Sequence, residues 1–297
     1  MKLKETKELF QNELAGLYDF EEIDSFFYIL IEHYLGLKRI ALALKPEISC
    51  SKEDLESILK ALEFLKKQIP IQYILGETEF FGLPFKVNSH VLIPRPETEE
   101  LVYQVLQYLK KINNRISFDR NLDKRPIPAI LDIGTGSGCI PVTIKKEYNE
   151  CNIIAVDISN AALKVAIHNA NHHGANVTFF KQDILSEKLT KPNEPYDIII
   201  SNPPYIPTSE IAVMSESTVK HEPQIALFTD DEFGLVFYQR IADLCSTWLA
   251  DNGAVFLELN EYHSHKIKEI FLKEGSFDSV EIIEDMQGKP RILFAVR

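Results

Sequence analysis

Apolar side chains recur at helical spacing through the first 70 residues. The clearest run joins Leu55, Ile58 and Leu62, which lie three or four positions apart and so fall on one face of a helix. Ser51 and Asp54 stand before that run as a capping pair, which is a common start signal for a helix. The pattern predicts a small helical bundle at the N-terminus.

The stretch 73–93 has a different pattern. Gly76 and Gly82-Leu83-Pro84 break it into short pieces that are typical of β-strands joined by turns. We therefore expect a β-hairpin linker here, between an N-terminal helical domain over 1–72 and a larger domain over 94–297.

A helix is expected to start near Glu97. After it, the segment 110–128 holds six Lys or Arg residues against two Asp, together with two prolines. Charge runs of this kind are usually solvated connections, and docking onto an anionic surface is the alternative. The segment is therefore expected to be a basic, mobile loop.

From residue 129 onward, short apolar strands alternate with amphipathic helices. This order predicts βαβ units and hence an α/β fold with a largely parallel sheet of seven strands. No helix separates the last two strands, which are joined by Gly288-Lys289-Pro290, so they should form an antiparallel pair at the sheet edge. The expected strands are 129–133, 153–157, 177–182, 196–201, 253–259, 278–284 and 291–296, and the expected helices start near 139 and cover 160–173, 234–250 and 263–273.

A glycine-rich turn follows the first of these strands. Gly134, Gly136 and Gly138 alternate there with Thr135 and Ser137. Backbone without side chains can approach a ligand closely, although a glycine loop alone can equally be a tight connection. The spacing GxGxG differs from the GxGxxG of dinucleotide-binding folds. It favours S-adenosylmethionine, a nucleoside cofactor that carries no phosphate.

Carboxylates end the next two strands. Asp157 is placed to accept hydrogen bonds from both hydroxyls of a ribose, as an acidic residue does at this position in dinucleotide folds. Asp183 is placed to accept a hydrogen bond from an adenine amino group, with Ile184 against the ring. The alternative for Asp183 is a helix cap or a loop carboxylate.

The tetrapeptide Asn202-Pro203-Pro204-Tyr205 follows the buried strand 196–201, at the edge where open α/β sheets bind ligands. Two prolines make the turn rigid and rich in acceptors. An NH2 group on sp2 carbon is a poor nucleophile because its lone pair is delocalised. The Asn202 side-chain oxygen and the Pro203 carbonyl can each accept one of its hydrogens and so orient the nitrogen, while Tyr205 stacks on the planar group. The alternative is an ordinary turn.

With these residues, the chain resembles the class I S-adenosylmethionine-dependent methyltransferases, and most closely the HemK/PrmC family. The resemblance runs over nearly the whole length. Besides the glycine loop and the tetrapeptide, it rests on Gln72-Tyr-Ile-Leu-Gly-Glu77, Phe81-Gly-Leu-Pro-Phe85, Val91-Leu-Ile-Pro-Arg-Pro-Glu-Thr-Glu99, His221-Glu-Pro223, Asp285, Gly288 and Arg291.

The resemblance implies a Rossmann-like class I methyltransferase fold, preceded by a helical domain that helps recognise the substrate. It implies an enzyme that methylates the N5 amide nitrogen of the glutamine in the Gly-Gly-Gln motif of peptide chain release factors, with S-adenosylhomocysteine as the second product. The glutamine enters the peptidyl-transferase centre during translation termination.

The resemblance also assigns site residues. Gly134–Gly138, Asp157, Ile184 and Asn202 would contact the cofactor, and Asn202–Tyr205 the substrate amide. It places Arg95, Glu97 and Thr98 on the cofactor side, although this string could equally be a helix cap.

Three positions depart from the family pattern. Phe233 stands where an Asp is usual, Asn260 where a Gly is expected, and His263 at a usual Gln. We expect these positions to lie away from the reacting amide.

The overall charge bears on the choice of partner. A formal net charge of −12 argues against a protein that grips phosphate backbones. The start of the chain has no apolar signal segment, and no stretch approaches the length of a membrane span, so a cytosolic protein is expected. We also expect a monomer. The four cysteines form no CxxC pair and fit reduced thiols. The histidine pairs have no carboxylate cluster at ligand spacing, so no metal is expected.

Two other functions remain open on the sequence. A DNA or RNA amino-methyltransferase uses a similar tetrapeptide on a flipped base but needs a basic strand-binding face. A catalytically silent protein with the same fold could act as a binding scaffold.

Overall fold

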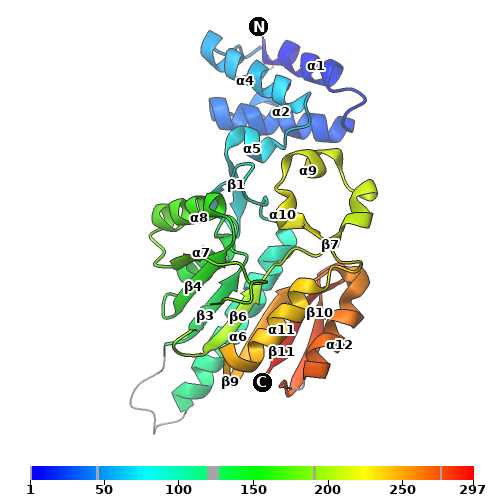
Figure 1. The fold of residues 1–297 in the computed structure, drawn as a ribbon. Helices are drawn as coiled ribbons and strands as arrows, with labels where there is room; N and C mark the ends of the chain where they lie inside the picture. Colours follow the sequence, from blue (N-terminus) through cyan, green and yellow to red (C-terminus); the bar gives the residue numbers. More distant parts are fainter. Residues whose placement is uncertain (1, 45–46, 119–126, 190–191, 275) are drawn as a thin grey trace. The chain divides into compact units, whose positions relative to one another are not determined.

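The computed structural model describes residues 2–44, 47–118, 127–189, 192–274 and 276–297. The chain divides into two compact units (Figure 1). The first comprises Met1–Gly76 together with Ser215–His221, and the second comprises Glu77–Met214 together with Glu222–Arg297. The inclusion of Ser215–His221 in the first unit has no counterpart in the sequence patterns.

The first unit is helical. Its elements are α1 (Leu3–Glu13), α2 (Phe20–Leu35), α3 (Arg39–Leu44), α4 (Lys52–Leu65), α5 (Ile71–Leu75) and α9 (Glu216–His221). Ile58, Leu62 and Leu65 of α4 are buried with Phe10 and Leu30 from α1 and α2, so the apolar stripe read from the sequence forms the core.

Two polar contacts fix the ends of α4. The Ser51 side chain accepts a hydrogen bond from the Asp54 backbone N–H at 3.1 Å, which confirms the predicted cap. A cap of this type stabilises a helix by about 1 kcal/mol. At the other end, the Tyr18 hydroxyl donates to the Leu65 carbonyl at 2.9 Å.

The second unit contains the sheets. Its elements are β1 (Glu77–Phe80), β2 (Leu83–Lys86), α6 (Pro96–Phe118), β3 (Ala129–Ile133), α7 (Cys139–Glu147), β4 (Asn152–Asp157), α8 (Asn160–His173), β5 (Thr178–Lys181), β6 (Tyr196–Ser201), β7 (Ile206–Pro207), η1 (Thr208–Val213), α10 (Gln224–Leu227), β8 (Phe228–Thr229), α11 (Val236–Trp248), β9 (Leu249–Glu258), η2 (Glu261–His263), α12 (Ser264–Glu274), β10 (Ser279–Glu284) and β11 (Pro290–Val296). β1 and β2 form an antiparallel hairpin. Its strands cover 77–86, whereas residues 73–75 of the expected linker are helical and belong to α5.

A seven-stranded sheet runs in the order β10-β11-β9-β6-β3-β4-β5. β3 pairs in parallel with β4 and β6, and β6 pairs in parallel with β9. β11 runs antiparallel to both β9 and β10, so the antiparallel pair at the edge is present and β10 is the outermost strand. The sheet confirms the predicted α/β class.

Helices cover both faces of this sheet (Figure 1). Successive residues of a strand point to opposite faces. Ile198 and Ile200 of β6 therefore pack with α6, α7 and α8, while Ile199 between them packs with α11 and α12. Burial on both faces explains why the strand reads as a continuous apolar run. Each fully buried side chain of this size contributes about 1.5–3 kcal/mol.

The helix α6 is longer than the sequence pattern suggests. It continues to Phe118, so residues 110–118 are helical and the expected loop is wrong over that part. No proline or glycine interrupts this stretch, and its charged residues are Lys and Arg, which are good helix formers, so the helix can continue. Residues 119–126 of the expected loop lie outside the described residues.

Candidate active site

A cavity of about 620 Å³ opens at the carboxyl ends of the parallel strands in the second unit. Its lining includes residues that follow β3, β4, β5 and β6, which are the positions where open α/β sheets bind ligands. The volume suits a cofactor-sized molecule. Of the predicted site residues, the lining contains Arg95, Thr98, Gly134, Thr135, Gly136, Ser137, Asp157, Asp183, Ile184, Asn202, Pro203 and Pro204, and it does not include Glu97, Gly138 or Tyr205.

The glycine loop is held against the end of β4. The backbone N–H groups of Gly134 and Thr135 donate to the Val156 carbonyl at 2.9 and 3.0 Å. Gly138 has φ +78, and a side chain there would press on Ala166 of α8, with an ideal Cβ 3.0 Å from the Ala166 Cβ. Gly138 therefore serves the packing of α7 on α8, while the earlier part of the loop borders the cavity.

Asp157 joins the loop to the cavity. One carboxylate oxygen accepts the Gly136 N–H at 2.9 Å and the other accepts the Ser159 N–H at 2.8 Å. Burial raises the pKa of Asp157, whereas these backbone hydrogen bonds lower it. Each carboxylate oxygen has a second lone pair. The side chain can therefore accept two further hydrogen bonds, the number that a ribose diol offers.

Asp183 and Ile184 border the cavity in different ways. Asp183 is exposed, and its carboxylate accepts the Leu185 N–H at 3.0 Å. Asp183 therefore has the role of a loop carboxylate, which was the alternative to adenine binding, and it also borders the cavity. Ile184 is buried and contributes apolar surface to the cavity.

Several buried polar atoms around the cavity have no hydrogen-bond partner among the described residues. Among them are Gln182 Nε2, Thr229 Oγ1 and Asp231 Oδ1. A buried polar group left unpaired costs about 1–3 kcal/mol. Their presence fits a ligand that carries several hydrogen-bonding groups, as an adenosine with an amino-acid tail does.

Asn202 leaves β6 directly into the cavity. Its side-chain nitrogen donates to the Thr98 hydroxyl at 3.1 Å. Ser201, one residue earlier, donates its hydroxyl to the Ile133 carbonyl at 2.7 Å and ties β6 to the strand that precedes the glycine loop. Pro203 is buried beside them. The tetrapeptide and the glycine loop therefore border the same space.

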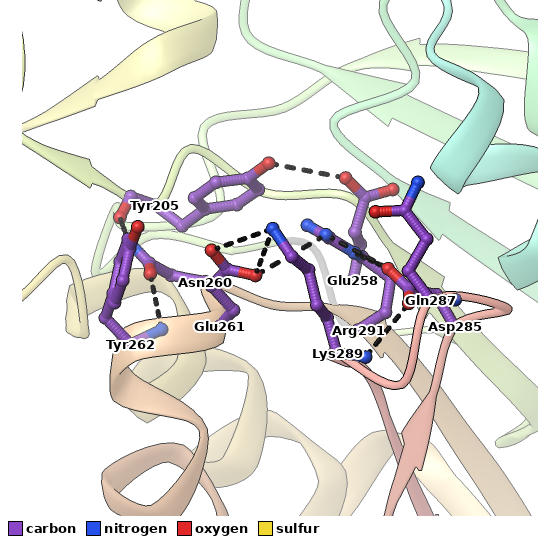
Figure 2. Close-up of polar contacts among 9 residues, drawn as sticks. All are labelled: Tyr205, Glu258, Asn260, Glu261, Tyr262, Asp285, Gln287, Lys289 and Arg291. Atoms are coloured by element: carbon purple, nitrogen blue, oxygen red, sulfur yellow. Dashed lines mark hydrogen bonds and ion pairs between the residues drawn. The ribbon is translucent and has the colours of Figure 1, made fainter. Parts of the chain in front are cut away.

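Tyr205 occupies a different environment from the other three residues of the tetrapeptide. Its ring packs against the core cluster under α11, and its hydroxyl lies 3.4 Å from the Glu258 carboxylate (Figure 2). Burial raises the pKa of Tyr205, so its hydroxyl keeps its proton. Stacking of Tyr205 on a substrate amide stays a prediction.

Arg95 and Thr98 enter the site from the start of α6. Arg95 forms an ion pair with the buried Glu222 at 2.5 Å, and Glu222 also accepts the Ile93 N–H at 3.2 Å. Thr98 is 3% exposed and donates its hydroxyl to Glu258 at 2.7 Å. Both side chains are thus fixed by buried carboxylates.

A network of charges surrounds Glu258 (Figure 2). Arg291 of β11 forms ion pairs with Asp285 at 3.2 Å and Glu261 at 3.9 Å, and Lys289 pairs with Glu261 at 3.3 Å. Burial raises the pKa of Glu258 to about 7, whereas the Thr98 hydrogen bond and the Arg291 charge lower it. Glu258 is therefore a buried carboxylate whose protonation changes near neutral pH.

Two family models match the chain: the PrmC N-terminal domain over residues 8–76 and the Methyltransferase small domain over residues 118–243. A release factor glutamine methyltransferase from Flavobacterium psychrophilum is 40% identical over 99% of this chain and 98% of its own length. Another, from Bacillus subtilis, is 37% identical over 90% of this chain and 89% of its own length.

The chain belongs to the release factor glutamine methyltransferase family. Family membership implies the use of S-adenosylmethionine. Among solved structures, the hMettl16 catalytic domain in complex with MAT2A 3′UTR hairpin 6 matches with a TM-score of 0.53 and 16% identity over 82% of each chain, a likeness that concerns the fold alone.

One departure from the family pattern contacts the tetrapeptide. The Asn260 side chain donates to the Tyr205 carbonyl at 3.5 Å, and the expectation that these positions lie away from the reacting amide stays a prediction. Phe233 and His263 pack edge to face with ring centroids 5.6 Å apart, so these two departures contact each other.

Gly234, next to Phe233, packs so closely against the tetrapeptide that there is no room for a side chain. It has φ +67, and an ideal Cβ would overlap the Tyr205 carbonyl oxygen. We expect Gly234→Ala to lower the free energy of unfolding by about 2–4 kcal/mol, because backbone must shift to admit the methyl group. Fluorescence of the single, buried Trp248 during urea unfolding would measure this in the second unit.

Gly174→Ala is the matched control. Gly174 has a similar φ of +62 with nothing within 4 Å of the added Cβ, so only the backbone cost of about 1 kcal/mol is expected. Equal losses in the two variants would show that the contact with Tyr205 is unimportant.

Glu222 and Glu258 are site residues that the sequence reasoning missed. A signal for Glu258 existed, because it is the one charged residue in the run 254–259 and ends a predicted parallel strand, as Asp157 does. Glu222 lies in the string His221-Glu-Pro223, but nothing local indicates its pairing with Arg95.

Two features are absent from the described residues. These residues contain no group of three or more His, Cys, Asp or Glu residues arranged to hold a metal ion. They also include no helix with the length and apolar character needed to cross a membrane.

Proposed function

We propose that this protein transfers a methyl group from S-adenosylmethionine to the N5 amide nitrogen of the glutamine in the Gly-Gly-Gln motif of peptide chain release factors. The observation that carries the proposal is the position of Asn202, which follows β6 into the cavity bordered by the glycine loop and Asp157. Relatives that are named for this activity span nearly the full chain, which supports the substrate class. The enzyme would act in the cytoplasm, where it would modulate translation termination.

The residues of the cavity suit the cofactor. Asp157 would hold the ribose hydroxyls, Ile184 would lie against the adenine ring, and the loop from Gly134 to Ser137 would accommodate the methionine portion. S-adenosylmethionine, when bound, supplies a methyl group activated by the positive charge on its sulfur.

Asn202 and Pro203 would prepare the substrate. The side-chain nitrogen of Asn202 donates a hydrogen bond to Thr98. The side-chain oxygen of Asn202 therefore points away from Thr98 and can accept one substrate N–H. The Pro203 carbonyl would accept the second. Two acceptors orient the substrate nitrogen and offset the positive charge that it acquires during attack. Holding the reactants in register can supply about 7–11 kcal/mol of the barrier reduction, so attack needs no strong base. The substrate nitrogen would gain the methyl group as the bond from that methyl to sulfur breaks, and it would then release its proton to water.

A nucleic-acid methyltransferase is the second candidate, and the relatives, which are named for release factor methylation, do not favour it. The net charge of −12 is also unsuited to a strand-binding surface.

The test is a transfer assay with labelled S-adenosylmethionine and either a purified release factor or DNA. We expect label on the release factor, and none on a release factor whose Gly-Gly-Gln glutamine is replaced by alanine. Label on DNA but not on the release factor would reject the proposal.

A further inference from the structure

Three side chains from distant parts of the second unit form one hydrogen-bonded chain. Asn202 donates to Thr98 at 3.1 Å, and Thr98 donates to Glu258 at 2.7 Å. Ser201 of β6 and Leu257 of β9 are paired in the sheet. Asn202 and Glu258, which come next on these two adjacent strands, therefore lie side by side. Thr98 and Glu258 are 3% and 2% exposed, so water does not replace these partners.

The Thr98 hydroxyl has a single proton. When Glu258 is ionised it can only accept hydrogen bonds, so that proton points to Glu258. The Thr98 oxygen then faces Asn202 with its lone pairs and must receive the carboxamide nitrogen. The opposite flip of the carboxamide would bring two acceptor oxygens together at this contact.

We propose that Glu258 is a positioning residue for the methyl transfer: through Thr98, its carboxylate fixes the flip state of the Asn202 carboxamide, so that the Asn202 oxygen faces the substrate amide. The proposal rests on the proposed function. Thr98 and Asn202 border the cavity, whereas Glu258 does not line it and is linked to Asn202 through Thr98.

The surroundings of Glu258 control its ionisation. The titratable and charged groups near it come from α6, α7, the tetrapeptide, α11, η2, β11 and the turn that follows β10. They are Glu97, Cys139, Tyr205, Tyr238, Glu261, Asp285 and Arg291. Burial raises the pKa of Glu258 to about 7, and the Thr98 hydrogen bond and Arg291 oppose this shift. Tyr238 donates its hydroxyl to the Glu258 carbonyl at 2.9 Å and holds the backbone in place.

Protonation of Glu258 would remove the ordering. A neutral carboxyl group can donate to Thr98, and the Thr98 proton is then free to point at the Asn202 oxygen. The arrangement needed for the reaction is therefore present above the pKa of Glu258 and is lost as the pH falls through it.

The first test uses steady-state kinetics on a release factor. We expect Thr98→Val to lower kcat by about 10- to 100-fold, with the Kd for S-adenosylmethionine changed by less than about threefold. Thr98→Ser keeps the hydroxyl and should recover most of the lost turnover. The matched control is Thr178→Val on the exposed face of β5. Equal losses in Thr98→Val and Thr98→Ser would contradict the proposal.

The second test asks whether Glu258 and Thr98 act as one unit. Glu258→Gln should lower kcat about as much as Thr98→Val, and the double variant should be no worse than either single one. Between about pH 6 and pH 8, log kcat should rise less steeply with pH in Glu258→Gln than in the unaltered protein. The difference in slope corresponds to one proton, because the variant lacks the titrating carboxylate. Burial also raises the pKa of Asp132 to about 7. Any effect of Asp132 on the pH profile is the same in Glu258→Gln and in the unaltered protein, so it cancels in the comparison. Additive losses of kcat, or an unchanged slope of log kcat against pH, would contradict the positioning of Asn202 by Glu258 through Thr98.

The third test needs neither cofactor nor substrate. In the 15N spectrum of the labelled protein, the Asn202 carboxamide signals are those absent from Asn202→Ala. We expect them to move in Thr98→Val and Glu258→Gln and to stay in place in Thr98→Ser. Unmoved signals would refute the positioning role. Absence of transfer by the unaltered protein would instead refute the proposed function.

Discussion

Replacement of Asn202 by alanine is expected to lower kcat by about 100-fold or more. The variant loses the acceptor that would orient the substrate nitrogen and offset its developing charge, a loss comparable to removing one oxyanion-hole donor. The Asn202 side chain contacts Thr98 rather than the Asp157 end of the cavity, so cofactor binding should change by less than about threefold. Steady-state transfer at saturating release factor measures the first effect, and titration calorimetry with S-adenosylmethionine measures the second.

The control for this variant is Asn171→Ala. Asn171 is exposed on α8, and its replacement should leave kcat unchanged. Near-normal turnover in Asn202→Ala would remove Asn202 from the mechanism, whereas a parallel loss of cofactor affinity would make it a cofactor-binding residue.

Replacement of Asp157 by asparagine is expected to raise the Kd for S-adenosylmethionine by about 10- to 100-fold, which corresponds to roughly 1.4–2.7 kcal/mol. Both carboxylate oxygens accept backbone N–H groups, from Gly136 and Ser159. An asparagine has one oxygen, so one of these N–H groups would face an NH2 group, and the acceptors left for the ribose are halved.

Asp183→Asn provides the comparison for Asp157. Asp183 is exposed and already accepts the Leu185 N–H with one oxygen, so a change of less than about threefold in Kd is expected. If Asp183→Asn weakened binding more than Asp157→Asn, the adenine end would dominate the affinity and the ribose role of Asp157 would be wrong.

Much of the fold could be predicted because its signals are local. The strands that became β3, β4 and β6 are unbroken apolar runs, and the parallel arrangement follows from their alternation with helices. The order of residues at the strand ends also brought the glycine loop, Asp157 and Asn202 to one cavity. The site could be read because the carboxyl ends of parallel strands meet at one edge.

The parts that could not be predicted depend on contacts between distant residues. Thr98 and Glu258 are 160 positions apart, and Arg95 and Glu222 are 127 positions apart, so no local pattern links them. The grouping of Ser215–His221 with the N-terminal helices is of the same kind. There the His221 ring lies 2.9 Å from the Lys67 carbonyl, across 154 positions. The extension of α6 was missed for another reason, because charged residues suit a solvated helix as well as a loop.

Tandem mass spectrometry of a release factor, incubated with S-adenosylmethionine and either the unaltered protein or Asn202→Ala, tests the central claim most directly. The account predicts one added methyl group on the side-chain amide of the Gly-Gly-Gln glutamine with the unaltered protein, and almost none with the variant. Methylation at another residue, or equal methylation by both proteins, would contradict it.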